Sequence, residues 1–188
     1  TGMLPLCFGK ATKLAQKLLE SNKFYQVTIK FGEKTTTGDA EGEVIETAPT
    51  DHITLELLQE TLKKFTGPIE QIPPMYSALK HQGKPLYELA RQGISIERKA
   101  RSVTIFEIIL DDFKAPSCQL TVHCSKGTYI RTLAEDIGAA LNSCAYVTAL
   151  RRTAVAPFQE TQMITLDELQ KVMDEQGASI LQQYLIPV

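Results

Sequence analysis

The chain has 188 residues, of which 43% are hydrophobic and 22% are charged, and its formal net charge is −2. This size and composition predict a single soluble globular domain with a complete hydrophobic core. Since no apolar run approaches the length of a membrane span and no signal-peptide pattern opens the chain, we expect a cytoplasmic protein without a membrane partner.

The first 31 residues predict a buried segment, a helix and a strand. Residues 1–9 are mostly apolar and read like the middle of a buried segment. Apolar side chains recur at helical spacing over residues 10–20, which predicts an amphipathic helix. In residues 25–31, apolar and polar side chains alternate, as in a strand with one face in the core. Tyr25 begins the apolar face of that strand.

A hairpin with a long tip and a second helix come next. Residues 36–42 form a polar, turn-rich loop, and residues 43–46 predict a short return strand. Asp39 lies in the loop and could present its carboxylate to a ligand, although a turn-forming aspartate is the simpler interpretation. Residues 54–65 then predict a helix with an apolar stripe for the core and a threonine N-cap.

The segment 69–101 differs in charge from the rest of the chain. From residue 76 onwards it holds six basic and two acidic residues, a local balance of +4. The basic residues are Lys80, Lys84, Arg91, Arg98, Lys99 and Arg101. Three rings, those of Tyr76, His81 and Tyr87, are interleaved with them, so the segment suits a single-stranded or looped RNA. A solvated, mobile loop is the alternative, and composition alone favours it.

A strand followed by a turn and a helix contains the best candidate for a binding site. Period-two alternation over residues 118–124 predicts a half-buried strand, and the β-prone run 102–113 is expected to pair with it. Thr128 is the predicted N-cap of the next helix. Tyr129 and Arg131 therefore fall in the first turn of a helix that leaves a buried strand.

Arg131 has two interpretations. A strand-to-helix turn holds side chains rigidly at the edge of the scaffold, where ligands are usually bound. Arg131 could pair with a surface carboxylate, which contributes little to stability. It could instead hold a carboxylate or phosphate through two parallel hydrogen bonds, with Tyr129 as a flat apolar neighbour. The residues of this stretch do not decide between the two.

Beyond this helix, the chain predicts one more strand and one more helix, but no cofactor site. The strand covers residues 145–158, and a capping box at residues 165–168 begins the helix. Neither the P-loop pattern nor the dinucleotide fingerprint occurs, and the histidine and cysteine spacings match no metal site. The residues alone predict an α+β domain associated with nucleic acid, without an obvious nucleophile.

Five runs of this sequence resemble the TruB family of tRNA pseudouridine synthases. They are Thr-Gly-Met-Leu-Pro-Leu-Cys-Phe-Gly-Lys-Ala-Thr-Lys (1–13), Tyr25 with its strand, Gly-Pro-Ile-Glu-Gln-Ile-Pro-Pro-Met-Tyr-Ser-Ala-Leu-Lys (67–80), His-Cys-Ser-Lys-Gly-Thr-Tyr-Ile-Arg-Thr-Leu (123–133) and Leu-Arg-Arg-Thr (150–153). They follow the family's order. The resemblance implies an α+β pseudouridine synthase fold, with a mixed, largely antiparallel central sheet flanked by helices, in one catalytic domain over residues 1–188.

The resemblance also implies an activity and a set of site residues. The activity is isomerisation of the T-loop uridine of tRNA at position 55, by a monomer that needs no metal or organic cofactor. By similarity, Tyr25 stacks on the flipped-out base and serves in proton transfer, and Tyr129 lines the same pocket. Arg131 would pair with the catalytic carboxylate, and Leu150 would close the apolar wall.

One segment fits the family and one motif departs from it. Residues 69–101 resemble the thumb loop that closes over the T-stem loop, with Lys80 and Lys84 as RNA contacts. The family's nucleophilic aspartate lies in Thr-Leu-Asp-Pro-x-Ala-Thr-Gly, of which this chain holds only the last two residues, Thr1 and Gly2. We therefore expect the nucleophile upstream of this chain and a C-terminal RNA-binding domain downstream of it. The alternative is a noncatalytic RNA-binding or RNA-folding module.

Overall fold

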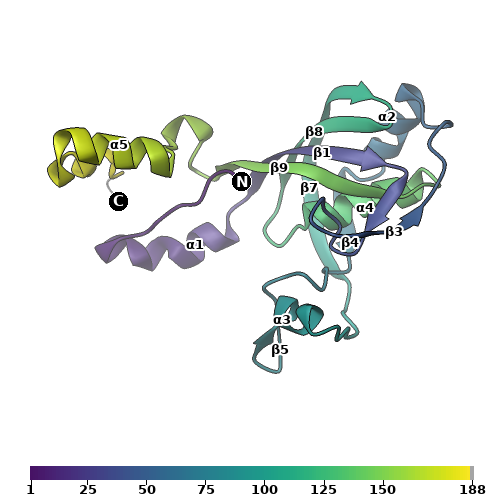
Figure 1. Cartoon of the computed structure of the whole chain (residues 1–188), viewed down its shortest axis with the longest axis horizontal. Helices are drawn as coiled ribbons and strands as arrows, with labels where there is room; N and C mark the ends of the chain where they lie inside the picture. Colours follow the sequence, from purple (N-terminus) through teal and green to yellow (C-terminus); the bar gives the residue numbers. More distant parts are fainter. Residues whose placement is uncertain (187–188) are drawn as a thin grey trace.

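An antiparallel five-stranded sheet forms the centre of the protein (Figure 1). The structure is a computed structural model and describes residues 1–186. Across the sheet, the strands lie in the order β4 (Gly67–Gln71), β7 (Arg101–Lys114), β8 (Ser117–Cys124), β1 (Lys23–Phe31) and β9 (Ala145–Val155). All of these neighbouring strands pair antiparallel. The predicted α+β class and the largely antiparallel central sheet are confirmed.

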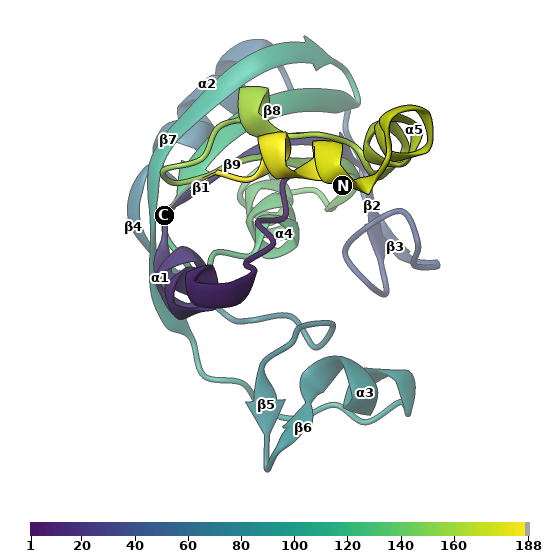
Figure 2. The same cartoon turned by 90° about the vertical axis from the view of Figure 1, so that its left-hand side faces the viewer.

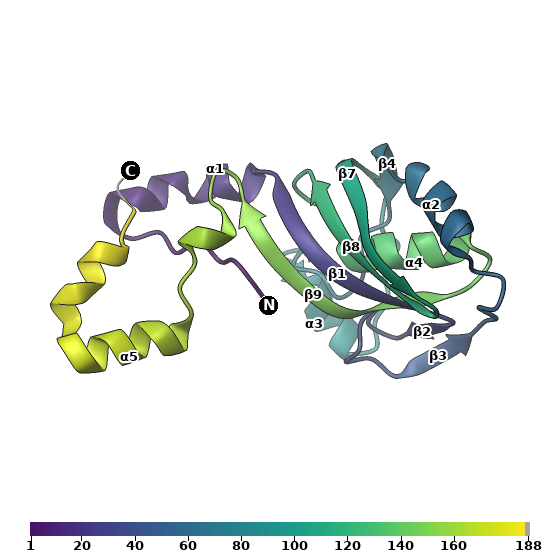
Figure 3. The ribbon, with the colours of Figure 1, turned by 90° about the horizontal axis from the view of Figure 1, so that it is seen from above.

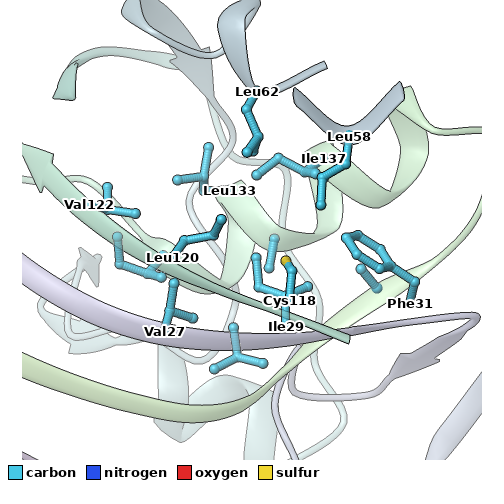
Figure 4. Packing of buried hydrophobic residues seen from close by; sticks show 14 of the residues in the cluster. Val27, Ile29, Phe31, Leu58, Leu62, Cys118, Leu120, Val122, Leu133 and Ile137 are labelled. Carbon is cyan, nitrogen blue, oxygen red and sulfur yellow. The ribbon is translucent and has the colours of Figure 1, made fainter. Parts of the chain in front are cut away.

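Two helices, α2 (Leu55–Lys63) and α4 (Ile130–Ala140), cover one face of this sheet and complete the core. Figure 4 shows their leucine and isoleucine side chains meeting those of β1 and β8. The predicted alternation in β8 is confirmed, since Leu120 and Val122 are fully buried. Thr54 caps α2 as predicted, because its hydroxyl accepts a hydrogen bond from the Leu57 amide at 3.2 Å. The core therefore fixes α4 against the sheet.

Smaller elements extend from the rim of the sheet. The predicted hairpin is present as β2 (Glu33–Thr35) and β3 (Val44–Thr47). Between β4 and β7, the chain forms a second hairpin, β5 (Lys80–His81) with β6 (Lys84–Pro85), and then α3 (Leu86–Arg91). Figure 2 shows this second group projecting from the body of the protein. The segment with the predicted positive charge is thus an excursion from the sheet.

The helical segments near both ends of the chain lie beyond one end of the sheet (Figure 3). A 3-10 helix (Gly9–Leu14) leads into α1 (Ala15–Glu20), and α5 (Leu166–Gln176) lies between the 3-10 helices Glu160–Gln162 and Ala178–Tyr184. The prediction of a buried segment over residues 1–9 is wrong, because Leu4, Leu6 and Phe8 are each at least 63% exposed. Only the first residues run along the sheet. Among residues 1–186, no helix has the length and apolar character of a membrane span.

Asp136, on α4, makes the stability of the fold depend on pH. Burial, followed by the neighbouring Glu135 carboxylate, raises the pKa of Asp136 from 3.8 to about 6. A raised pKa favours the protonated form in the folded state. The contribution of this group to the free energy of unfolding is therefore largest below pH 4 and is lost as the pH rises through about 6.

We expect Asp136→Asn to raise the free energy of unfolding at pH 7.5 by about 1 kcal/mol, less than the roughly 3 kcal/mol that two pKa units represent, because solvent screens a half-buried group. The gain should vanish near pH 4. Urea denaturation at both pH values checks this, with Asp51→Asn at an exposed position as the control. Equal gains at both pH values would contradict it.

Candidate active site

Arg131 connects three parts of the chain at the start of α4. Its Nη1 donates to the Asp39 carboxylate at 2.9 Å and to the Thr37 carbonyl at 3.2 Å, and its Nη2 donates to the Tyr76 carbonyl at 2.7 Å. The Arg131 side chain is only 24% exposed. A guanidinium has five N–H donors, so two remain after these three contacts with residues 1–186. Arg131 is therefore fixed in place and can still bind a second carboxylate.

Asp39 forms the turn that the sequence favoured, and it has a second role, an ion pair within the protein, that the sequence did not predict. Its Oδ1 accepts hydrogen bonds from the Thr37 hydroxyl and from the Glu41 amide, which forms the predicted turn. Its Oδ2 pairs with Arg131, and its side chain is 26% exposed. Sequence reasoning treated Asp39 mainly as a turn residue. The second role comes from an ion pair between positions 92 residues apart, which no local pattern reveals.

Tyr129 is held at the start of α4 by a buried glutamine. Gln71 of β4 is 2% exposed, and its amide side chain accepts from the Tyr129 N–H at 3.0 Å and donates to the Tyr129 carbonyl at 3.2 Å. The prediction of Thr128 as N-cap is wrong. Its hydroxyl donates back to the Ser125 carbonyl at 2.9 Å, and Tyr129 occupies the N-cap position. The capping side chain is therefore that of Gln71, which lies on β4 and accepts the hydrogen bond of the Tyr129 amide.

We expect Gln71→Leu to lower the free energy of unfolding by about 2 kcal/mol, because the Tyr129 amide would lose its partner, while the Tyr129 carbonyl would keep only the Leu133 amide. Chemical denaturation at pH 7 measures the loss. Glu70→Gln, on the exposed face of the same strand, is the matched control and should change little. The interpretation of Gln71 is wrong if the two variants are equally stable.

Tyr25 and Leu150 share one face of the sheet. In the antiparallel pair of β1 and β9, Val27 lies opposite Leu150 and Tyr25 lies opposite Arg152. Because side chains two residues apart project to the same face, Tyr25, Leu150 and Arg152 line the face that α4 covers. Tyr25 and Leu150 pack against the core cluster. Burial raises the pKa of the Tyr25 hydroxyl, so it remains protonated at neutral pH.

The predicted RNA contacts are separate from this group. Lys80 and Lys84 lie on the exposed β5–β6 hairpin. They make no ion pair among the described residues. The structure therefore places Tyr25, Leu150, Tyr129 and Arg131 on β1, β9 and α4 of the body, and the two lysines on the projecting segment.

The groups predicted for the site suit a polar substrate with a flat ring. They are a partly buried tyrosine, an apolar wall and a guanidinium with further donors, and such groups stack on a base and orient an anion. In residues 1–186, no group of three or more His, Cys, Asp or Glu side chains is placed to hold a metal ion.

Comparisons with known proteins agree on one family. The family model for the N-terminal domain of TruB family pseudouridylate synthases matches residues 1–130, and the model for the C-terminal domain of tRNA pseudouridylate synthase B matches residues 131–188. The chain is 52% identical over 175 residues to a Vibrio parahaemolyticus protein named tRNA pseudouridine synthase B, covering 93% of this chain and 55% of that protein. A Haemophilus influenzae protein of the same name is 52% identical over 187 residues, covering 100% and 61% of the two chains.

A solved structure supports the same relationship. The fold is similar to a chain in the crystal structure of a Cbf5-Nop10-Gar1 complex, with a TM-score of 0.72 and 26% identity over 97% of this chain and 45% of that one. The chain spans 55 to 61% of the length of the two named relatives. Since a family model covers more than two thirds of its residues and the relatives are 52% identical, the chain belongs to the TruB family of pseudouridylate synthases.

Proposed function

We propose that this chain forms the greater part of the catalytic domain of an enzyme that isomerises the T-loop uridine of tRNA to pseudouridine. The observation that carries the proposal is the 52% identity, over 93 to 100% of the chain, to proteins named tRNA pseudouridine synthase B. The enzyme would act as a cytoplasmic monomer without a metal or organic cofactor, as the family resemblance implies. The pre-organised Arg131 supports an active site at the start of α4.

The reaction exchanges one bond of the substrate for another. The bond between N1 of the base and C1′ of the ribose breaks, the base turns, and a bond from C5 to C1′ forms. The proton on C5 leaves to solvent and N1 gains one, so the atoms balance. Tyr25 would stack on the flipped-out base and serve in proton transfer, with Tyr129 and Leu150 lining the pocket. Arg131 would orient the nucleophilic carboxylate and keep it ionised.

The nucleophile would come from a segment upstream of Thr1. The amino group of Thr1 donates to the Leu150 carbonyl at 3.0 Å, and residues 1–3 run parallel to this part of β9. A residue before Thr1 would therefore lie beside β9 near Leu150. Leu150 is two residues from Arg152, which lies opposite Tyr25. This path supports delivery of an upstream aspartate to the proposed pocket.

The segment 69–101 would act as the thumb-like loop that binds the T-stem loop. We expect replacement of Lys80 and Lys84 by alanine to lower the slope of log affinity against log salt by about 2, because each phosphate contact releases about one counterion. Filter binding of a T-stem-loop RNA at several KCl concentrations measures the slope. A paired change at Lys114 and Lys171, exposed lysines outside the segment, is the control. Identical slopes for both double variants would show that Lys80 and Lys84 of this loop do not contact the RNA.

Nucleoside analysis tests the function itself. The full-length protein is incubated with an unmodified tRNA transcript, which is then digested and separated by liquid chromatography. One pseudouridine per tRNA, absent when the T-loop uridine is replaced by cytidine, is the expected result. Salt-sensitive binding without any pseudouridine would favour the noncatalytic RNA-binding module, for which the exposed Lys80 and Lys84 are the supporting observation.

A further inference from the structure

We propose that Arg152 is a positioning residue that holds Tyr25 and residues 1–3 in a fixed relation to each other. The inference rests on the proposed function and adds a residue to its site. Arg152 lies on β9, two residues from Leu150, and it is opposite Tyr25 of β1. Like Leu150, it contacts both β1 and residues 1–3, but Arg152 lies directly opposite Tyr25 and makes three hydrogen bonds with residues 1–3.

The contacts with residues 1–3 involve both backbone and side chain of Arg152. Its Nε donates to the Met3 carbonyl at 2.7 Å, its backbone carbonyl accepts from the Met3 amide at 2.7 Å, and its amide donates to the Thr1 carbonyl at 3.1 Å. Met3 is 5% exposed. These residues are the only part of the first nine that the structure anchors to the sheet in this way, and Arg152 makes three of the anchoring bonds.

Gly2 shows how closely the two segments approach. It forms a parallel bridge with Arg152, and its φ of +104° is a conformation that favours glycine. A Cβ added at Gly2 would lie 2.3 Å from the Arg152 carbonyl oxygen, inside contact distance. The fit leaves no room for a side chain. Residues 1–3 are therefore held at one register against Arg152.

The side chain of Arg152 is also the cross-strand neighbour of Tyr25. Burial, followed by the nearby Cys124, raises the pKa of the Tyr25 hydroxyl, while the charge of Arg152 lowers it. The same charge, after burial, lowers the pKa of Lys23 at the start of β1. Because Arg152 lies directly opposite Tyr25 in the β1–β9 pair, the two side chains are neighbours on one face of the sheet. A phenol that must stack on a base and move a proton depends on such an orientation.

The adjacent arginine provides a matched control. Arg151 points to the opposite face of β9, where its Nε pairs with the Glu160 carboxylate at 2.9 Å, and its side chain is 45% exposed. Arg151→Gln and Arg152→Gln change the charge of the protein equally, one residue apart in the same strand. Differences between the two variants therefore report on what Arg152 contacts.

The first measurement compares rate with affinity in the full-length protein. Arg152→Gln should lower the single-turnover rate of pseudouridine formation by about tenfold or more, with the RNA dissociation constant changed by no more than about twofold. Arg152→Lys should recover part of the rate, because an ammonium reaches one of the two partners. Combined with Tyr25→Phe, Arg152→Gln should cost less than the product of the two single losses, since both act through the hydroxyl. Rates equal to those of Arg151→Gln, or fully multiplicative losses, would overturn the proposal.

A second measurement does not require activity. Hydrogen exchange of the Met3 amide should become about tenfold or more faster in Arg152→Gln and stay unchanged in Arg151→Gln. If the unaltered protein makes no pseudouridine, the proposed function fails, while this exchange still decides whether Arg152 holds residues 1–3. Unchanged exchange in both variants would show that the guanidinium does not anchor them.

Discussion

Arg131→Ala in the full-length protein is expected to lower the rate of pseudouridine formation by about 10²-fold or more, with RNA affinity nearly unchanged. The guanidinium is held by Asp39, Thr37 and the Tyr76 carbonyl, and its remaining donors are free to orient a second carboxylate. Removing one pre-organised donor from an active site costs about 10² to 10³ in rate. Single-turnover kinetics with saturating enzyme separate this loss from any loss of binding.

The control for this prediction makes the same change of charge at a position outside the proposed active site. Arg151→Ala removes an exposed arginine that pairs with Glu160, and it should leave the rate within about twofold. Thermal melting of both variants shows whether the fold is intact. If Arg131→Ala forms pseudouridine at the rate of the unaltered protein, the role given to Arg131 is wrong.

Leu120→Ala is expected to lower the free energy of unfolding by about 3 to 5 kcal/mol. Leu120 is fully buried in β8, the middle strand, where it lies opposite Val27 of β1 and Leu110 of β7. Truncation removes apolar contacts and leaves a cavity that a sheet strand between two partners cannot collapse to fill. Such a loss is a large share of the total stability of a domain.

A substitution at the neighbouring residue in β8 shows whether the loss of stability comes from the core or from any change in this strand. Gln119 is exposed on the other face of the sheet, and Gln119→Ala should change the free energy of unfolding by no more than about 0.5 kcal/mol. Urea denaturation of the two variants at one pH gives both values. Comparable losses would mean that the core does not lie on the predicted face of β8.

The main strands could be predicted from the sequence because their signal is local. Alternation in β1 and β8 reflects one buried face per strand, and it correctly placed Tyr25 in the first and the core residues of the second. The capping box at the start of α5 was also confirmed, with Thr165 and Glu168 exchanging backbone contacts. The helix after β8 was predicted, but its N-cap was not, because a side chain from a different strand makes the capping contact.

The partners within the site could not be predicted, because they come from distant parts of the chain. Asp39 and Arg131 meet only when the β2–β3 hairpin packs beside α4. Gln71 left a weak signal, since alternation from Gly67 puts it on the buried face, where an amide needs partners. Arg152 left a similarly weak signal, because it lies two residues from Leu150 and therefore on the same face of β9. In each case the pattern indicates burial, and only the fold identifies the contact.

The release of tritium from tRNA carrying 5-tritiated uridine tests the central claim most directly, because formation of the C5–C1′ bond expels the hydrogen on C5. The full-length protein should release the label from one uridine per tRNA, and residues 1–188 alone should bind the tRNA and release none, since the proposed nucleophile lies upstream of Thr1. No release by the full-length protein would contradict the proposed function. Release by residues 1–188 alone would contradict the upstream nucleophile and point to a carboxylate within the chain, with Asp39 beside Arg131 as the first to test.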